Sequence, residues 1–566
     1  MKKVIVVLLV CCVCACQEEK NTKVDPYAYT SVKRIVVKHA AVSSAHPLAS
    51  AIGAAILKRG GNAIDAAIAT QLALAVVYPE AGNIGGGGFT VIHLANGKNT
   101  TIDYRERAPG KASRNMYLNE GGKVIPEASL TGALAAGVPG TVAGIFMAHR
   151  KYGKLPMKTL IQPAIDLAAH GFAITERAAR NLNRYQDDFG RINVVHNAFM
   201  RPEWHAGDTL IQKDLAHTLA LIRDKGEAGF YEGETAGKIV AEMKRGKGMI
   251  SLADLKEYRA VERAPIKVNY KGYTIVGMPP PSSGGILLAQ MLGMLRPYSI
   301  EKYGFETVQS VQLMAEVERR AFADRATYLG DPDFVEMPLE KMISESYLRK
   351  RMADYDSVHA TPSAEIKAGK ILHESNQTTH LSVVDSAGNA VAVTYTLNSL
   401  YGCKEVVADA GFFLNNEMND FSAKPGAPNK NGLVYGAEAN AIAPNKRMLS
   451  SMSPTIVLRN NDPYLVLGTP GSATIITSVF QTLVDILDFK MSVSDAVNGP
   501  KFHMQWMPDR IDVEKNFPDS VMQKLREMGY AFKQLNAIGR TEVIKIEGDS
   551  IEAVGDSRGD DSAAGY

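Results

Sequence analysis

The apolar residues between Pro47 and Val77 recur at intervals of three and four positions, interrupted by Gly60-Gly61. This spacing places them along helices, and small residues on both sides of the pattern predict that these helices are tightly packed and mostly buried. A second, amphipathic helical pattern covers Gln309 to Leu329 and is closed by Gly330-Asp331-Pro332. The stretch from about 155 to 260 alternates helical patterns with Gly/Pro turns.

The pattern changes to strands after residue 378. His380 to Asp385 forms one predicted strand, Ser386 to Asn389 a turn, and Ala390 to Leu397 a second strand rich in β-branched residues. We expect a hairpin whose first strand begins at Thr378. The polar, irregular segment 353–376 just before it is the kind of linker in which a chain tolerates being cut.

Two glycine-rich segments need separate interpretations. Gly85 to Gly88 lacks the GK[ST] ending of a phosphate-binding loop and precedes a strand, so close backbone packing in a turn explains it better. Residues 278–285 contain three prolines, two serines and two glycines. We predict irregular structure there, which serves either as a rigid connector or as a functional loop.

The N-terminus has the pattern of an export signal. Lys2 and Lys3 precede an apolar run that is too short to span a bilayer, which takes about 20 residues. The run ends in Val13-Cys14-Ala15-Cys16, which resembles a bacterial lipobox. Residues 1–16 are then a lipoprotein signal peptide that leaves Cys16 as the lipid-bearing first residue. We expect an exported protein anchored in the bacterial cell envelope, on the periplasmic side or at the outer membrane. An ordinary signal peptide cleaved nearby is the alternative.

Charge and cysteine content exclude several classes. With 63 basic and 60 acidic side chains, the chain gives no electrostatic reason to expect nucleic acid. Apart from Cys16 and the leader cysteines, only Cys403 remains, so no internal disulfide framework is expected. The 12 histidines show no HExxH spacing, and nothing in the sequence calls for a metal or an organic cofactor.

The run from Asn376 to His380, followed by Thr394 to Asn398, resembles the processing site of the γ-glutamyltranspeptidases, a family of N-terminal nucleophile hydrolases. The resemblance runs from about residue 37 to the C-terminus. It includes further ordered blocks: Asp103-Tyr104-Arg105-Glu106, the segment 278–285, Asn415 to Phe421, Ser450 to Thr455, and Gly468 to Ser472. It implies a four-layer αββα sandwich.

The resemblance also implies that the precursor cleaves itself between Gln377 and Thr378. The products would be a large subunit, 17–377, and a small catalytic subunit, 378–566, which stay interleaved as one domain. A Thr hydroxyl needs a base within reach. A terminal α-amine has a reference pKa of about 7.7–8.0, so as a new N-terminus Thr378 would carry both nucleophile and base.

The family pattern assigns roles around this nucleophile. Thr396 would hydrogen-bond the Thr378 hydroxyl, and the backbone N–H groups of Gly471 and Ser472 would form the oxyanion hole. The common form of that turn has two consecutive glycines, so Ser472 is a departure. A positive φ there would strain a serine.

Substrate specificity follows in the same way. Arg105 would bind the α-carboxylate of a γ-glutamyl group, assisted by the hydroxyls of Ser450 and Ser451. The residues expected to contact the α-ammonium group are Asn398, Glu417 and Asp420. The implied donors are glutathione and other γ-glutamyl compounds, and the acyl group would pass to water or to an amino acid or peptide acceptor.

A second departure lies in the segment 425–432, which is a lid in many bacterial relatives, with an aromatic residue where Asn431 stands. A more open pocket would favour hydrolysis over transfer. Two alternatives to a γ-glutamyl transferase remain open. One is an acylase of the same fold that acts on β-lactam side chains or on poly-γ-glutamate. The other is a non-catalytic, lipid-anchored binding protein that has kept the pocket.

Overall fold

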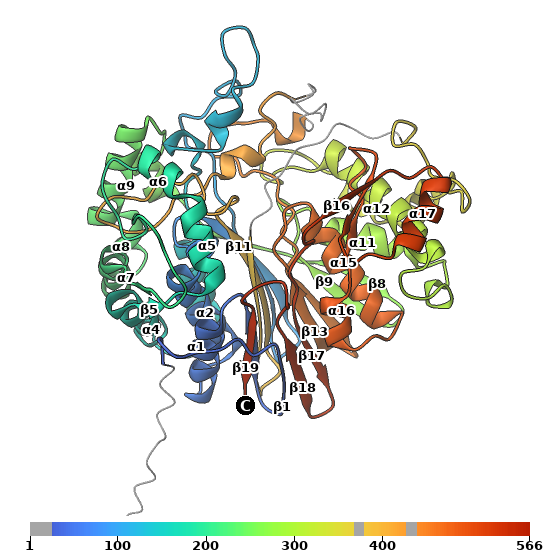
Figure 1. The fold of residues 1–566 in the computed structure, drawn as a ribbon, viewed down its shortest axis with the longest axis horizontal. Helices are drawn as coiled ribbons and strands as arrows, with labels where there is room; N and C mark the ends of the chain where they lie inside the picture. The colour runs from blue at the N-terminus through green and yellow to red at the C-terminus, as the bar shows by residue number, and fades with distance from the viewer. Residues whose placement is uncertain (1–24, 367–377, 426–437) are drawn as a thin grey trace, which may run out of the picture.

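The computed structural model describes residues 25–366, 378–425 and 438–566. Two seven-stranded sheets form its centre, and helices cover the outer face of each (Figure 1). The predicted four-layer αββα sandwich is therefore confirmed. Cys16, Gln377 and Asn431 lie outside the described residues.

The first sheet is built mainly from the second half of the chain. Its order is β1 (Arg34–Val37), β18 (Ser550–Val554), β17 (Glu542–Glu547), β13 (Asp462–Gly468), β12 (Thr455–Arg459), β9 (Tyr273–Gly277) and β8 (Ile266–Tyr270). All neighbouring strands in it are antiparallel.

The second sheet holds the predicted hairpin near its middle. Its order is β19 (Ser562–Gly565), β2 (Ala41–Ser44), β10 (Thr379–Val384), β11 (Ala390–Thr396), β3 (Gly87–His93), β4 (Asn99–Tyr104) and β7 (Val261–Arg263). Strands from before and after residue 378 are thus mixed in both sheets. Apolar side chains such as Val91, Ile456 and Val466 fill the space between the sheets.

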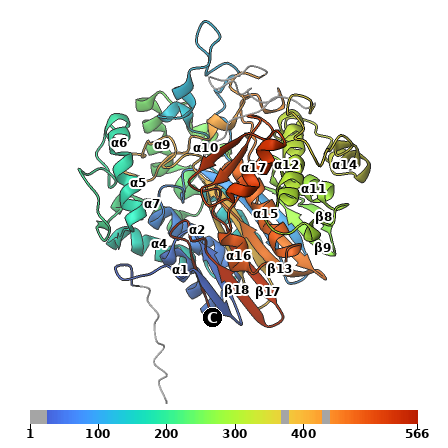
Figure 2. The same ribbon diagram turned by 45° about the vertical axis from the view of Figure 1, so that its right-hand side comes forward.

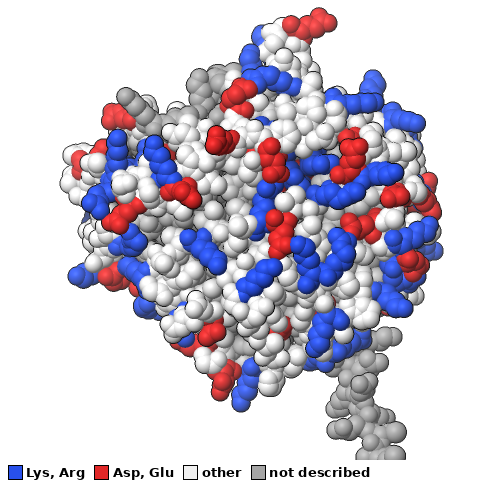
Figure 3. All heavy atoms as spheres, turned by 180° about the vertical axis from the view of Figure 1, so that it is seen from behind, with Lys and Arg blue, Asp and Glu red and all other residues white. Residues whose placement is uncertain are grey.

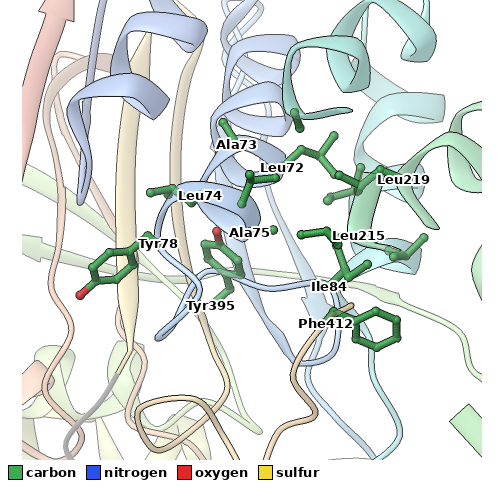
Figure 4. Packing of buried hydrophobic residues seen from close by; sticks show 14 of the residues in the cluster. Leu72, Ala73, Leu74, Ala75, Tyr78, Ile84, Leu215, Leu219, Tyr395 and Phe412 are labelled. Atoms are coloured by element: carbon green, nitrogen blue, oxygen red, sulfur yellow. The ribbon is translucent and has the colours of Figure 1, made fainter. Parts of the chain in front are cut away.

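One helical layer covers the second sheet. It consists of α1 (Pro47–Lys58), α2 (Ala63–Val77), α3 (Thr141–Tyr152), α4 (Met157–His170), α5 (Glu176–Arg184), α6 (Gln186–Ile192), α7 (Lys213–Lys225), α8 (Ala228–Tyr231), α9 (Gly233–Gly246) and α10 (Leu252–Glu257). Every residue of α2 is buried, as the pattern between Pro47 and Val77 predicts. Leu72 and Leu74 of α2, Leu215 and Leu219 of α7 and Tyr395 of β11 belong to one buried cluster, in which Leu74 lies on the side of α2 away from α7 (Figure 4).

The other helical layer covers the first sheet. It consists of α11 (Gly284–Leu295), α12 (Val308–Tyr328), α13 (Leu339–Met342), α14 (Glu345–Arg351), α15 (Thr474–Leu487), α16 (Val493–Asn498) and α17 (Asp519–Glu527). Figure 2 shows α15 and α16 against β13 and β17. A small sheet of β14 (Phe502–His503), β15 (Ile511–Glu514) and β16 (Phe532–Leu535) adjoins this layer, and β5 (Phe172–Ala173) pairs with β6 (Thr209–Leu210) in the other.

Two sequence predictions need correction in this layer. Gly284 and Gly285 do not belong to an irregular segment; they are the first two residues of α11. The helix predicted from Gln309 to Leu329 exists as α12, but its polar face is not exposed, because residues 310–326 are all buried. Its charged side chains form internal ion pairs, for example those of Arg319 and Arg320 with Glu316.

The surface matches the near balance of charges. On the face opposite that of Figure 1, basic and acidic side chains are intermingled (Figure 3). None of the helices that the described residues form combines the length and the apolar content needed to cross a bilayer.

Candidate active site

Thr378 and Thr396 lie at the same end of the β10–β11 hairpin. Thr379, the first residue of β10, pairs with Tyr395 in the antiparallel register. Thr378, one residue earlier, therefore lies beside Thr396, the last residue of β11. Gly86 packs directly on this end, since a Cβ at Gly86 would lie 2.0 Å from the Thr396 carbonyl oxygen. The close backbone packing predicted for Gly85 to Gly88 is thus confirmed, and it fixes the position of Thr396.

A pocket with an empty volume of about 220 Å³ opens next to Thr378. It brings together nine residues that the sequence nominates from distant segments: Arg105, Thr378, Thr396, Asn398, Glu417, Asp420, Ser450, Ser451 and Ser472. Met452 and Ile475 complete its lining. Gly471 lines a neighbouring cleft that also reaches Thr378. Only 5% of the Thr378 surface is exposed, so the hydroxyl lies in a largely enclosed site.

Arg105 follows β4 directly and is held in place by its backbone. Its N–H donates to Asp103 Oδ1 (2.9 Å), and its carbonyl accepts from the Tyr258 hydroxyl (2.8 Å). The guanidinium is 1% exposed and forms ion pairs with Glu417 (2.7 Å), Asp420 and Glu106 (3.5 Å). Burial acts to lower the pKa of Arg105, but the three carboxylates outweigh it and raise the pKa above its ordinary value.

Glu417 and Asp420 are the ends of a short 3₁₀ helix, η4 (Glu417–Asp420). The Asn415 side chain accepts from the Glu417 N–H (3.0 Å), and Asn440 donates to the Asp420 carbonyl (2.7 Å). Burial raises the pKa of Glu417 to about 8, although Arg105 acts against the rise. A cation that enters this site would therefore favour ionisation of the Glu417 carboxyl.

Asn398 closes the pocket beside Thr396 with a left-handed backbone (φ 72°), which asparagine tolerates better than most residues. Its N–H donates to Thr396 Oγ1 (2.7 Å), and its side-chain amide donates to the Asn416 carbonyl (3.0 Å). These bonds tie the end of β11 to the segment that carries the two acids.

The serine pair rests on the segment 278–285, for which the sequence left two roles open. Ser283 Oγ donates to the Ser450 carbonyl (2.7 Å), and Ser282 Oγ donates to the Met452 carbonyl (2.6 Å). Arg325 of α12 bridges the two segments, since its guanidinium donates to Ser283 Oγ (2.8 Å) and to Ser451 Oγ (3.0 Å). The segment thus supports the pocket wall as well as connecting β9 to α11.

The turn after β13 has a positive φ at Ser472, the position at which the sequence predicts strain. Gly471 has φ 139° and Ser472 has φ 60°, in the left-handed region that costs a serine free energy. Thr474 Oγ1 donates to the Gly471 carbonyl (2.7 Å) and secures the turn. Ser472 Oγ is buried without a hydrogen-bond partner among the described residues, so the turn does not depend on this hydroxyl.

Comparison with known proteins agrees with this geometry. The family model described as "Gamma-glutamyltranspeptidase" matches residues 49–566. The chain belongs to the γ-glutamyltranspeptidase family. The glutathione hydrolase proenzyme of Escherichia coli K12 is 46% identical over 535 residues, which is 94% of this chain and 92% of that protein.

Two solved structures are similar to this chain. The γ-glutamyltranspeptidase of Helicobacter pylori is 45% identical, with a TM-score of 0.56, and covers 57% of this chain and 94% of that one. The cephalosporin acylase of Bacillus halodurans has a TM-score of 0.80 and covers 96% of this chain and 99% of that one. At 23% identity, the acylase shows a shared fold only.

Arg325 and Glu106 also belong to the site, although the sequence does not nominate them. The amphipathic pattern from 309 to 329 places Arg325 on a helix but does not reveal that the side chain reaches Ser451. Glu106 was visible only as the neighbour of Arg105, yet it is buried, and burial raises its pKa to about 8 against the effect of Arg105. In the described ranges no three His, Cys, Asp or Glu side chains are grouped as metal ligands.

Proposed function

We propose that this chain is an autoprocessed γ-glutamyl transferase and glutathione hydrolase. The observation that carries the proposal is the pocket beside Thr378, where one buried guanidinium lies among carboxylates and hydroxyls. A γ-glutamyl group carries an α-carboxylate and an α-ammonium on one carbon atom, so it needs this mixture of partners. Membership of the family and the name of the Escherichia coli relative support the same function.

Maturation begins at the Gln377–Thr378 bond. Thr378 Oγ attacks the Gln377 carbonyl carbon, the peptide C–N bond breaks, and the acyl group moves to the oxygen while the nitrogen takes a proton. Water then hydrolyses this ester and leaves a large subunit, 17–377, and a small subunit, 378–566. The mixing of strands from both segments in each sheet supports a heterodimer that stays together as one domain.

In turnover the Thr378 amine accepts the hydroxyl proton while Oγ attacks the γ-carbonyl carbon of the donor. The backbone N–H groups of Gly471 and Ser472 stabilise the resulting oxyanion, and Thr396 orients the hydroxyl. The leaving amine takes the proton, and a γ-glutamyl ester of Thr378 remains. Water or the amine of an amino acid or peptide then attacks the ester and restores the hydroxyl.

Recognition uses the two sides of the pocket. Arg105 binds the substrate α-carboxylate in a two-pronged contact, with Ser450 and Ser451 as further donors. The α-ammonium is bound by Asn398, Glu417 and Asp420. The Arg105–Glu417 contact supports this arrangement. It places the group that would bind the carboxylate of an incoming amino acid next to the group that would bind its ammonium, and both are buried.

The mature protein is exported and lipid-anchored in the bacterial envelope through Cys16, which becomes its first residue when the signal peptide before it is removed. Asn431, in place of an aromatic lid residue, leaves the acyl-enzyme open to water and shifts the balance toward hydrolysis. Replacing it with tyrosine should raise the ratio of transfer to hydrolysis; an unchanged ratio would disprove this part of the proposal.

Release of p-nitroaniline from a γ-glutamyl anilide tests the function. The wild-type chain should release it, and the Thr378→Ala variant should be inactive and remain uncleaved. As a matched control, Thr327→Ala changes a threonine of α12 that lies outside the pocket and should keep the wild-type rate. Equal activity of the wild type and the Thr378→Ala variant would refute the assignment.

A further inference from the structure

A second cleft reaches Thr378 from the other side of the oxyanion turn. Its empty volume is about 1010 Å³, against about 220 Å³ for the γ-glutamyl pocket. Ser472 lines the smaller pocket, whereas Pro470 and Gly471 line the larger cleft. The turn therefore separates the two spaces at the point where the scissile carbonyl would lie. With the acyl group in the smaller pocket, the leaving group extends into the larger cleft.

The cleft is lined by three arginines, and none of the described residues in its lining is acidic. Arg177 comes from α5, Arg540 from the loop before β17, and Arg558 from the loop before β19. Figure 1 shows α5 and β16, the strand before the Arg540 loop, on opposite sides of the central strands. Three chain segments thus converge on one cationic lining.

Two of these arginines are held in strong ion pairs. Arg558 lies 2.7 Å from Glu514 and 3.0 Å from Asp556, and Arg540 lies 3.0 Å from Asp561. Both are therefore part of the framework. The partner acids also offset most of the local charge, so recognition in the cleft depends on direct hydrogen bonds more than on a long-range field.

Arg177 has the most donor capacity left. Its buried Nε faces Glu80 at 3.5 Å, its Nη1 donates to the Arg558 carbonyl at 3.4 Å, and its Nη2 makes no hydrogen bond with the described residues. Its side chain is 28% exposed, so a ligand in the cleft can reach it. The edge formed by Nη1 and Nη2 still has N–H groups for a ligand, and such an edge fits a carboxylate in a two-pronged contact.

We infer that Arg177 binds the terminal carboxylate of the leaving peptide, so that the enzyme prefers γ-glutamyl peptides with a free C-terminus. This inference rests on the proposed function and adds the specificity of its leaving-group side. For glutathione the carboxylate is that of the glycine residue, and the leaving group is cysteinylglycine. Arg540 and Arg558 shape the cleft around it.

The test compares glutathione with its C-terminal amide as donors, measured as glutamate released. One hydrogen bond between charged groups corresponds to roughly tenfold or more in kcat/KM. The wild type should prefer the acid by about that factor. The Arg177→Gln variant should lower the ratio toward one, and Arg177→Lys, which keeps the charge but not the fork, should give an intermediate ratio.

Arg180→Gln is the matched control, because Arg180 lies on the same helix, is 64% exposed and pairs with Glu176 away from the cleft. It should keep the wild-type ratio. A wild-type ratio near one, or the same ratio in Arg177→Gln as in the wild type, would overturn the inference. A thermal melt of each variant shows that the comparison is made on folded protein.

Binding separates this inference from the proposed function. Saturation-transfer NMR with cysteinylglycine on the uncleaved Thr378→Ala chain requires no turnover. The signal should be present, should be lost when Arg177→Gln is added, and should persist when Arg180→Gln is added. Loss of the signal with Arg177→Gln supports the cleft even if the chain released no glutamate. An absent signal, or one unaffected by Arg177→Gln, refutes it.

Discussion

Arg105 Nη1 lies 2.7 Å from Glu417 Oε2 inside the buried pocket. Burial raises the pKa of Glu417 to about 8, so in the empty pocket its carboxyl holds a proton most of the time at neutral pH. An α-amino acid group can insert between the two side chains, with its carboxylate on Arg105 and its ammonium on Glu417, and the ammonium favours ionisation of the carboxyl. The contact thus selects a zwitterionic head group.

Replacing Arg105 with lysine should weaken donor binding while keeping the charge. Lysine cannot make the two-pronged contact, and loss of one charged hydrogen bond of about 1.5–3 kcal/mol raises KM by roughly tenfold to a hundredfold. Steady-state kinetics with a γ-glutamyl anilide measure this. Arg34→Lys, at an exposed ion pair with Glu552, is the control. A wild-type KM for Arg105→Lys would show that the guanidinium does not bind the donor.

Binding of L-glutamate should release protons at neutral pH. The pKa of Glu417, about 8 in the empty pocket, lies above pH 7, so its carboxyl is mostly protonated. An ammonium group beside it lowers that pKa, and roughly one proton leaves the site. Calorimetry in buffers of different ionisation enthalpy detects the release. Glu417→Gln should release fewer protons, and a binding enthalpy independent of buffer would contradict the predicted ionisation.

Variants at Ser472 should separate the contribution of its backbone conformation to catalysis from that of its hydroxyl. The left-handed conformation suits glycine, so Ser472→Gly should keep kcat within about threefold, whereas Ser472→Val adds strain of roughly 1–3 kcal/mol at the oxyanion turn and should lower kcat at least tenfold. Activity and thermal melting are measured together. A large loss of kcat in both Ser472→Gly and Ser472→Ala would instead show that the hydroxyl contributes to catalysis.

Arg325 should act as a positioning residue for Ser451. Arg325→Met removes its bonds to Ser283 and Ser451, so KM for the γ-glutamyl donor should rise about tenfold with a smaller change in kcat. Arg325→Lys should restore part of the loss. Arg349→Met, on an exposed side chain of α14, is the control. If kcat falls while KM stays at the wild-type value, Arg325 does not position the binding wall.

The sequence predicted those parts of the site that depend on local pattern. The alternation after residue 378 yields the β10–β11 hairpin, and the hairpin alone brings Thr378 and Thr396 together. The resemblance to the γ-glutamyltranspeptidases nominated Arg105, Glu417 and the serine pair, and all of them line the pocket.

What the sequence could not predict depends on contacts between distant segments. The contact of Arg105 with Glu417 joins residues far apart in the chain. The burial that raises the pKa of Glu417, and the burial of Glu106, likewise depend on how distant segments pack around them. In the same way, the pattern of α12 shows a helix with charged positions. Only the packing of α12 against the segments of Ser283 and Ser451 shows where Arg325 is directed.

Peptide mapping of the acid-quenched enzyme tests the role of Thr378 most directly. The protein is mixed with a γ-glutamyl donor, denatured within the first turnovers and analysed by mass spectrometry. We expect a small fragment whose N-terminal residue is Thr378 and whose first peptide carries one added γ-glutamyl group. A chain that stays uncleaved between Gln377 and Thr378 while it turns over substrate, or a γ-glutamyl group on another residue, would rule out Thr378 as the nucleophile.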